Sequence, residues 1–255
     1  MASNPRDGVK ITVYWLEKSR AQRILWLLEE LDLPYEIKLY KRGADKLAGP
    51  ELKEIHPLGK SPVISIEKAP NPPLVLAESG AIVEYLIDHF GPHIVPKRYP
   101  DGKEGQVGGE TESWRRDRYF MHYNEGTLMA ILVRKLIAEG IRDAPVPFFI
   151  KPITRTIGSQ VESLVVKPDL DANLAFLEDQ LKTSPGGGPF FCGDSLTGSD
   201  ILMSFPLEAG VQRGFINKNT YPRLTEYVSM IQGREAHKGA IQKIVQLEGS
   251  YELAP

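Results

Sequence analysis

The sequence predicts two domains, an α/β domain followed by an all-helical one. Period-two and helical patterns of apolar residues alternate up to residue 91, and only helical patterns follow after residue 109. Residues 92–109, which are rich in glycine, proline and charge, are typical of a linker. A chain of 255 residues is long enough for each part to bury a core of its own. We therefore expect domains over residues 1–91 and 110–255.

The first domain opens with a strand, a helix and a second strand. Apolar and polar residues alternate from residue 9 to residue 15, which predicts a strand. Apolar residues recur at helical spacing over residues 19–31, and Pro34 follows this helix. Alternation returns at residues 35–39 and predicts a second strand. So compact a unit favours a parallel pair of strands joined by a right-handed crossover.

The rest of the first domain is predicted to contain an irregular helix, two short strands and a final helix. Residues 43–56 are polar and mixed, which is typical of an irregular helix. Short strands at 63–66 and 74–76 flank a Pro-rich turn at 69–73, so we expect an antiparallel hairpin. Helical spacing then covers residues 79–89. The resulting order, βαβαββα, is that of a thioredoxin-like domain.

The second domain is predicted to contain helices alone. The first of them is long and is expected to bend at Gly126. The next helix has an apolar stripe made of Ile150, Ile153, Ile157, Val161 and Leu164. The expected helices cover residues 110–140, 148–166, 170–181, 200–210, 221–231 and 235–245.

Charge and cysteine content exclude several classes of protein. A formal net charge of −2 gives no electrostatic footprint for nucleic acid. We interpret Arg115, Arg116 and Arg118 as a solvated or ion-paired face of a helix. Cys192 is the single cysteine, which excludes an internal disulfide and suits a reducing compartment. A thiol redox site near the N-terminus is excluded for the same reason.

The distribution of apolar residues indicates a cytosolic protein. No segment approaches the roughly 18 consecutive apolar residues of a membrane-spanning helix. Residues 1–7 are polar and lack the apolar centre of a signal peptide. We expect the cytosol as the compartment, which is compatible with peripheral attachment to a membrane, and we expect no metal.

Ser61 and Pro62 stand directly before a predicted strand. In thioredoxin-like folds a cis proline begins this strand, and the preceding residue offers its backbone to a bound thiol peptide. The N–H and C=O of Ser61 would then pair with the cysteinyl part of the peptide, as an added strand does. The alternative is an ordinary trans proline at the first residue of a strand.

Glu78 and Ser79 open the predicted helix at residues 79–89. The start of a helix offers unpaired N–H groups and partial positive charge, so a carboxylate would bind there with Ser79 as a donor. Glu78 would pair with an ammonium group. The α-carboxylate and α-ammonium of one amino acid together fit these two residues. The alternative is a plain helix capped by Ser79.

Two further motifs lie at helix starts. Thr197 and Asp200 have the spacing of a capping box, whose role is structural. Tyr14 and Ser19 flank the turn after the first strand, where a hydroxyl donor would stabilise a thiolate. In the alternative interpretation, Ser19 is simply the N-cap of the first helix.

Together these motifs resemble the glutathione transferase family over nearly the whole chain. The segments that resemble a fungal and bacterial subgroup are SRAQRILWLLEEL (19–31), HPLGKSP (56–62), AESG (77–80) and DILMSFP (200–206). Any one of them is weak, but their common order and spacing are specific. Residues 142–168 form a longer segment than a compact member needs, so substrate preference is not carried over from better-known classes.

The resemblance implies a glutathione site at Lys60, Ser61, Glu78 and Ser79, with a cis bond before Pro62. It also implies a site for small hydrophobic electrophiles between the domains, lined partly by the helix at 110–140, and a homodimer. The residue that activates the thiol is a Tyr, Ser or Cys in this family. The helix register places either Lys18 or Ser19 at the serine position, so Ser19 is our first candidate and Tyr14 the second.

Three functions follow as expectations. The leading one is a detoxifying glutathione S-transferase, in which the thiolate attacks an electrophilic carbon or reduces a hydroperoxide. The second is a non-catalytic regulatory protein that keeps the glutathione site, because fold does not fix function. The third, disulfide reduction, is disfavoured because no N-terminal cysteine is present.

Overall fold

A computed structural model describes residues 7–44 and 47–253 of the chain. Residues 1–6 make up most of the polar segment that was judged, from the sequence, to lack the apolar centre of a signal peptide, and they lie outside the described residues. Residues 45 and 46, within the segment expected to form an irregular helix, also lie outside them.

The first part of the chain has the predicted βαβαββα order. Its four strands form one sheet in the order β2-β1-β3-β4, with β1 parallel to β2 and antiparallel to β3. A hairpin joins β3 to β4. The elements are β1 Lys10–Leu16, α1 Gln22–Glu30, β2 Tyr35–Tyr40, α2 Leu52–Ile55, β3 Val63–Glu67, β4 Leu74–Ala77 and α3 Ser79–Phe90.

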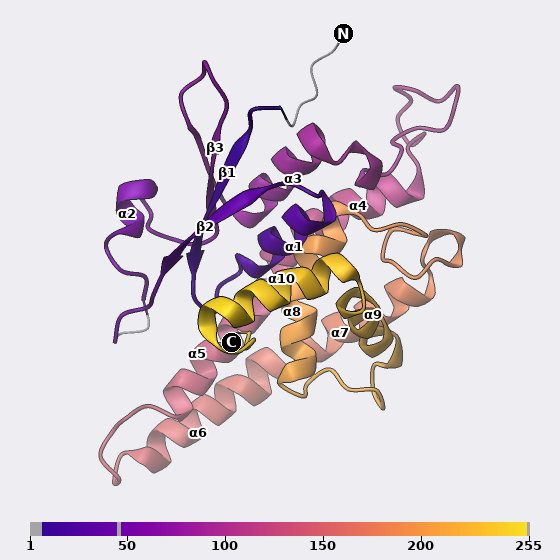
Figure 1. Ribbon diagram of the computed structural model, residues 1–255. Coiled ribbons are helices and arrows are strands. Elements are labelled where there is room, and N and C mark those ends of the chain that lie inside the picture. Colours follow the sequence, from indigo (N-terminus) through magenta and orange to yellow (C-terminus); the bar gives the residue numbers. More distant parts are fainter. Residues whose placement is uncertain (1–6, 45–46, 254–255) are drawn as a thin grey trace.

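The two faces of the sheet are covered differently (Figure 1). Ile11, Val13 and Trp15 of β1 belong to the large core cluster that includes the residues of α1 and α3. Tyr14 and Leu16 point to the other face, because side chains alternate along a strand, and there they form a small cluster around α2.

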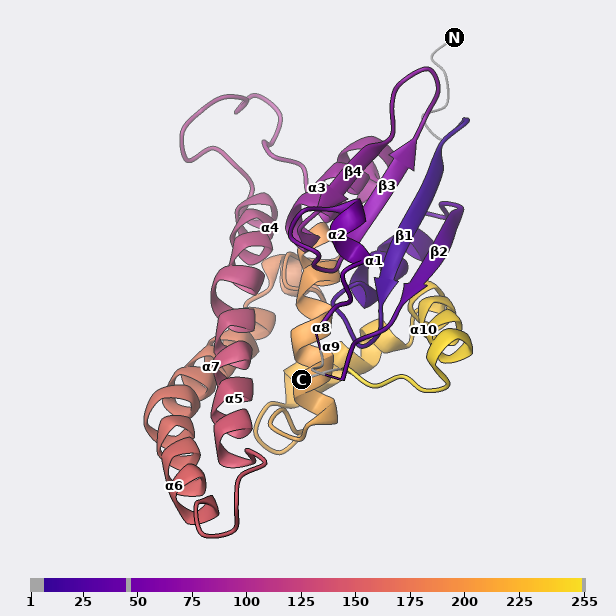
Figure 2. The same cartoon turned by 90° about the vertical axis from the view of Figure 1, so that its left-hand side faces the viewer.

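The second domain consists of helices, and all strands of the described residues precede residue 78. α4 and α5 run as one long helix beside the sheet domain (Figure 2), broken by a π-helical turn at Asn124–Leu128. This turn contains Gly126, the residue at which a bend was expected, and interrupts the regular α-helical hydrogen-bond pattern there. The helices are α4 Glu112–Tyr123, α5 Met129–Arg142, α6 Lys151–Val161, α7 Lys167–Lys182, α8 Gly198–Gln212, α9 Pro222–Gln232 and α10 Glu235–Glu248.

The helices expected at 148–166 and 170–181 are in fact one continuous run. A second π-helical turn, Glu162–Val166, joins α6 to α7, and Pro168 occupies the first turn of α7. Proline has no N–H to donate within such a run, and the π-helical turn directly before it already interrupts the regular hydrogen-bond pattern. The predicted stripe on α6 is not buried, since Ile153, Ile157 and Leu164 are 59%, 47% and 75% exposed.

A different face of α6 packs against α5. At Gly158 the two helices come so close that an added Cβ would lie 2.6 Å from the carbonyl oxygen of Ala138 and 2.7 Å from the backbone N of Arg142. Apolar periodicity therefore identified the helix correctly but not the face that its neighbour covers.

The capping box at α8 is present as predicted. The backbone N–H of Thr197 donates to Asp200 Oδ2 over 2.8 Å, and the hydroxyl of Tyr227 donates to Asp200 Oδ1 over 2.9 Å. Burial raises the pKa of Asp200 to about 6 against the opposing effect of these hydrogen bonds. Leu196 and Ile201, on either side of this helix start, are both buried.

Two other expectations have clear outcomes. Arg116 pairs with Glu112, and Arg118 pairs with Glu84 of α3, so the basic cluster is an ion-paired helix face. Cys192 is buried, and burial raises the pKa of its thiol far above the ordinary value. No helix among the described residues has the length and apolar character needed to cross a bilayer.

Replacing Gly158 by alanine should destabilise the protein by about 1–3 kcal/mol, because the new methyl group meets backbone atoms that cannot move away. Gly140→Ala is the matched control, since an added Cβ there meets nothing within 4 Å. On an exposed helix this change should stabilise by up to about 1 kcal/mol. Thermal unfolding of both variants tests the packing of α5 on α6, and equal melting temperatures would contradict it.

Candidate active site

Two hollows share lining residues near the β1–α1 turn; the larger lies between the sheet domain and the helical domain, and the smaller lies within the sheet domain. The larger is a cleft of about 660 Å³ bounded by the β1–α1 turn on one side and by α5 and α8 on the other. The smaller, of about 130 Å³, lies between the start of β3 and the start of α3. Arg20, Leu58, Lys60 and Ser61 line both hollows and mark where they meet.

The smaller hollow brings together five residues that were predicted as a binding site from separate motifs. Its lining includes Lys60, Ser61, Pro62, Glu78 and Ser79. The Ser61–Pro62 peptide bond is cis, which rules out the trans alternative. Three segments far apart in the sequence meet here because β4, which leads into α3, pairs with β3 directly after Pro62.

Ser79 is the first residue of α3 and not its N-cap, which corrects one interpretation of the sequence. Glu78 occupies the cap position with a φ of +73°, a left-handed conformation that is strained for a residue with a side chain. This backbone leaves the carboxylate of Glu78 exposed beside the unpaired N–H groups of the first helical turn. A negative group and a partial positive charge thus lie next to each other in the hollow.

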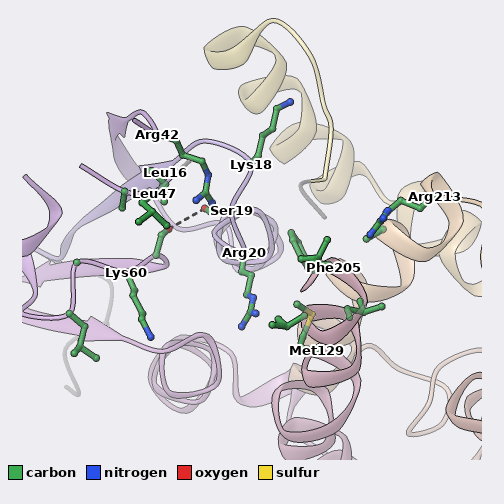
Figure 3. A pocket seen from close by; sticks show the side chains of 18 of the residues that line it. Leu16, Lys18, Ser19, Arg20, Arg42, Leu47, Lys60, Met129, Phe205 and Arg213 are labelled. Carbon is green, nitrogen blue, oxygen red and sulfur yellow. Dashed lines mark hydrogen bonds between the residues drawn. The ribbon is translucent and has the colours of Figure 1, made fainter. Parts of the chain in front are cut away.

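Ser19 lies in the turn between β1 and α1, three residues before the helix begins. The N-cap of α1 is Ala21, so Ser19 does not cap this helix. Its Oγ accepts a hydrogen bond from the N–H of Ala21 over 3.3 Å and lies 3.1 Å from Ser61 Oγ (Figure 3). Because a hydroxyl has one proton, the proton of Ser19 is left to donate toward Ser61 or into the cleft.

The other candidates of this turn point elsewhere. Lys18 also lines the cleft, but its side chain extends toward the C-terminal segment in Figure 3, where its Nζ lies 2.6 Å from Glu252. The hydroxyl of Tyr14 lies 3.1 Å from Ser65 Oγ, and Tyr14 packs in the cluster on the α2 face of the sheet. Tyr14 is not among the described residues that line either hollow, whereas Ser19 lines the cleft.

A buried ion pair fixes this turn to the helical domain. Arg23 of α1 is fully buried, donates to the carbonyl of Leu202 in α8 over 2.9 Å, and pairs with Glu125 over 2.7 Å. Desolvation lowers the pKa of Arg23 to about 10, although the carboxylate of Glu125 opposes this. The same carboxylate holds Arg20 at the edge of the cleft over 2.7 Å.

The contribution of Glu125 was not predicted from the sequence. This residue lies in the π-helical turn, and more than a hundred positions separate it from its two arginine partners. The one available signal was the expected bend at Gly126, which adjoins it in the sequence.

The wall of the cleft opposite Ser19 is apolar. Met129, Leu132 and Leu136 of α5, together with Phe205 and Ala209 of α8, line this wall. The expectation that the helix at 110–140 lines a site between the domains agrees with this arrangement. Among the described residues no group of three or more His, Cys, Asp or Glu side chains is placed to hold a metal ion. The lining places a hydroxyl group, that of Ser19, in a cleft with one apolar wall, beside a small polar hollow.

The sequence matches two families of domain. Residues 19–89 match the Glutathione S-transferase, N-terminal domain, and residues 140–235 match the Glutathione S-transferase, C-terminal domain. Glutathione S-transferase 1 of Saccharomyces cerevisiae is 31% identical over 94% of this chain and 98% of the yeast protein. Glutathione S-transferase 3 of Schizosaccharomyces pombe is 30% identical over 92% of this chain and 88% of that protein.

Solved structures show the same fold. A glutathione S-transferase from Actinobacillus pleuropneumoniae superposes with a TM-score of 0.62 at 29% identity, and the match covers 92% of both chains. The glutathione transferase URE2P8 from Phanerochaete chrysosporium, solved with oxidized glutathione, gives a TM-score of 0.69 at 15% identity over 96% of this chain and 98% of its own. At that identity the likeness concerns the fold alone.

Glu125→Gln should lower the free energy of unfolding by about 2–3 kcal/mol, because it leaves the buried guanidinium of Arg23 without a counter-charge. Glu112→Gln makes the same chemical change in the more exposed pair with Arg116 and should cost less than about 1 kcal/mol. Denaturant unfolding of the two variants measures both values. Similar losses would show that burial of Arg23 does not matter.

Proposed function

This chain belongs to the glutathione S-transferase family, and from that premise we propose that it is a catalytic transferase that joins the glutathione thiolate to small apolar electrophiles. The observation that supports catalysis best is the position of Ser19. Its hydroxyl group lines the cleft and lies 3.1 Å from the hydroxyl group of Ser61, a residue that lines both hollows. One of its two acceptor lone pairs is occupied by the N–H of Ala21.

The small hollow has the charges needed to hold glutathione. The α-carboxylate of the γ-glutamyl end would bind at the start of α3 with Ser79 as a donor, and the ammonium beside it would pair with Glu78. The cysteinyl backbone would pair with Ser61, and the glycyl carboxylate would lie near Lys60. Each charged group of the tripeptide then meets an opposite charge or a set of N–H donors.

Ser19 would act on the sulfur. A thiol has a reference pKa of about 8.5, and a hydrogen bond donated to the thiolate favours the ionised form. Lowering this pKa by roughly two units takes about 2.7 kcal/mol and leaves most of the sulfur ionised at neutral pH. Ser61, within 3.1 Å of Ser19, would orient its hydroxyl for that donation.

Two reactions are open to the thiolate in the cleft. Attack on an electrophilic carbon forms a C–S bond and expels the leaving group with its electron pair. Alternatively, two glutathione molecules reduce a hydroperoxide to an alcohol and water and become glutathione disulfide. The cytosol is the proposed compartment, in keeping with the single cysteine.

We also propose that the protein is a homodimer. Leu74 and Val75 lie on the edge strand β4 and are 38% and 40% exposed, and Tyr119 of α4 is 50% exposed. Exposed apolar groups on an edge strand favour association. Light scattering at micromolar concentration should give a mass of twice 28.5 kDa, and a mass of 28.5 kDa would contradict the proposal.

Ser19→Ala should raise the apparent pKa in the pH profile of kcat/KM and lower the rate at neutral pH, while glutathione binding changes little. Glu78→Gln is the matched counterpart, because it removes the partner of the ammonium and not the donor to sulfur. Its affinity for glutathione should fall by roughly ten- to a hundredfold, while the apparent pKa in the pH profile stays the same as in the wild type. Turnover with a neutral aryl halide and a hydroperoxide supplies both profiles.

The outcomes separate the candidate functions. Coincident pH profiles for wild type and Ser19→Ala would eliminate Ser19 as the activating residue and would make Tyr14→Phe the next variant. Tight glutathione binding without turnover of any electrophile or hydroperoxide would instead support a non-catalytic regulatory protein.

A further inference from the structure

The cleft has a cation, Arg213, at the end that lies away from the small hollow proposed to hold glutathione. Phe205, Ala209 and Arg213 follow one another at intervals of four residues along α8 and just past its end, so they share one face of the helix. All three line the cleft. From Phe205 to Arg213 the helix rises about 12 Å at 1.5 Å per residue. The cleft therefore passes along an apolar row and ends at a guanidinium.

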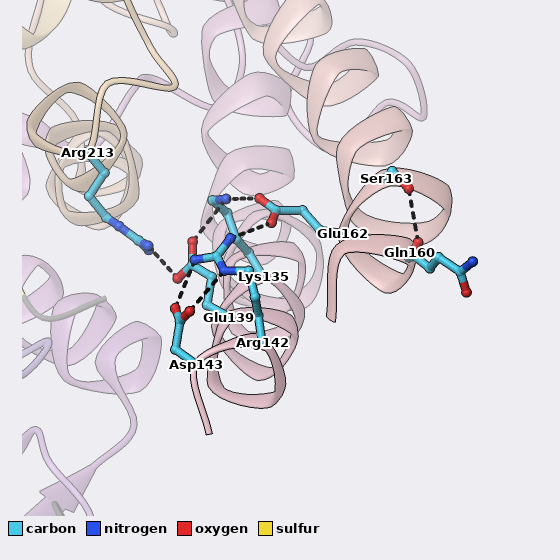
Figure 4. Close-up of polar contacts among 8 residues, drawn as sticks. All are labelled: Lys135, Glu139, Arg142, Asp143, Gln160, Glu162, Ser163 and Arg213. Carbon is cyan, nitrogen blue, oxygen red and sulfur yellow. Dashed lines mark hydrogen bonds and ion pairs between the residues drawn. The ribbon is translucent and has the colours of Figure 1, made fainter. Parts of the chain in front are cut away.

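Helix α5 provides a second row of apolar side chains along the cleft. Met129, Leu132 and Leu136 line the cleft, and one turn beyond them Glu139 reaches the guanidinium of Arg213 over 2.5 Å. Figure 4 shows that Glu139 is shared, because Lys135 also pairs with it over 3.1 Å. Among the described residues, Glu139 is the one hydrogen-bond partner of the Arg213 side chain.

Arg213 thus retains unused donor capacity. A guanidinium has five N–H donors, of which the bond to Glu139 uses one, and the side chain is 25% exposed. The two neighbouring cations of the network are better matched, since Lys135 and Arg142 both contact Glu162 as well. Arg213 is therefore the cation of this group that lines the cleft with donors to spare.

The charged residues that line the cleft also favour an anionic ligand. Its described lining includes six lysine and arginine side chains and no aspartate or glutamate. Lys60 and Arg20 line the small hollow as well as the cleft, whereas Arg213 lines the cleft only, beyond the two rows of apolar side chains. A single guanidinium fork at the end of an apolar slot matches one carboxylate at the end of an apolar chain.

We propose that the second substrate is an amphipathic electrophile, an apolar chain that carries its reactive carbon at one end and a carboxylate at the other, and that Arg213 binds this carboxylate. The proposal rests on the proposed transferase function and specifies its substrate class. For a 2-alkenal of this kind, the sulfur forms a bond to C3, and the π electron pair moves to C2, which takes a proton from water. The thiol adds across the double bond, and no further reactant is required.

The test uses two 2-alkenals with chains of about ten carbons, chosen to match the rise along α8. One ends in a carboxylate and the other in its methyl ester, so they differ in charge and share the reactive group. The wild type should prefer the carboxylate in kcat/KM. Arg213→Gln should reduce the ratio of carboxylate to ester by about tenfold or more, and Arg213→Lys should restore part of it.

Glu139→Gln is the control for a merely structural role of Arg213. This variant breaks the same ion pair but keeps the guanidinium, so the ratio should stay the same or rise as the competing carboxylate is lost. If Glu139→Gln and Arg213→Gln reduce the ratio equally, Arg213 only fastens α8 to α5 and the proposal is overturned. A wild type that turns over both alkenals without preferring the carboxylate overturns it as well, and the transferase function stands.

A binding arm separates failure of the two proposals. If neither alkenal reacts, turnover of the aryl halide and the hydroperoxide decides the transferase function, and calorimetry with decanoate and decanol on the glutathione-saturated protein decides the role of Arg213. Tighter binding of decanoate that is lost in Arg213→Gln supports the carboxylate site. Equal binding of the two probes, or equal binding by both proteins, refutes it.

Discussion

Burial of one guanidinium, that of Arg23, organises the junction between the two domains. A cation without water needs a carboxylate and a carbonyl, and the helical domain supplies both through Glu125 and the backbone of Leu202. Neither domain satisfies Arg23 alone, so docking of the helices against α1 is tied to this one charge. The guanidinium also lies 5.5 Å from the ring of Phe205, which places a wall of the cleft by the same contact.

The geometry of the candidate site follows from that junction. Glu125 projects from the π-helical turn between α4 and α5, and it holds Arg20 as well as Arg23. The β1–α1 turn is thereby fixed at both ends, by the sheet and by the helical domain, and Ser19 is held within it. Because α5 continues directly from the π-helical turn, its row of apolar side chains lies across the cleft from the β1–α1 turn. Glutathione and an apolar substrate would therefore meet beside the hydroxyl group of Ser19.

Much of the fold and part of the site could be predicted because the signals are local. Alternating apolar residues, the proline before β3 and the pair at the start of α3 each encode their own structure within a few positions. Boundaries were less certain: Ser79 begins α3 without capping it, and Ser19 precedes the cap of α1. Glu125 and Arg213 could not be found in this way, since their roles depend on partners that packing alone brings near. Periodicity likewise marked the stripe of α6 but carries no information about which face a neighbour will cover.

In the proposed function, the β1–α1 turn places the hydroxyl group of Ser19 where it would favour ionisation of the sulfur of bound glutathione. The most direct measurement is the ultraviolet absorbance of the thiolate, titrated against pH on the wild-type protein saturated with glutathione. We predict an apparent pKa roughly two units below the thiol reference of about 8.5, so that the absorbance is already near its plateau at neutral pH. A titration that coincides with that of free glutathione would show that the site binds the peptide without activating it.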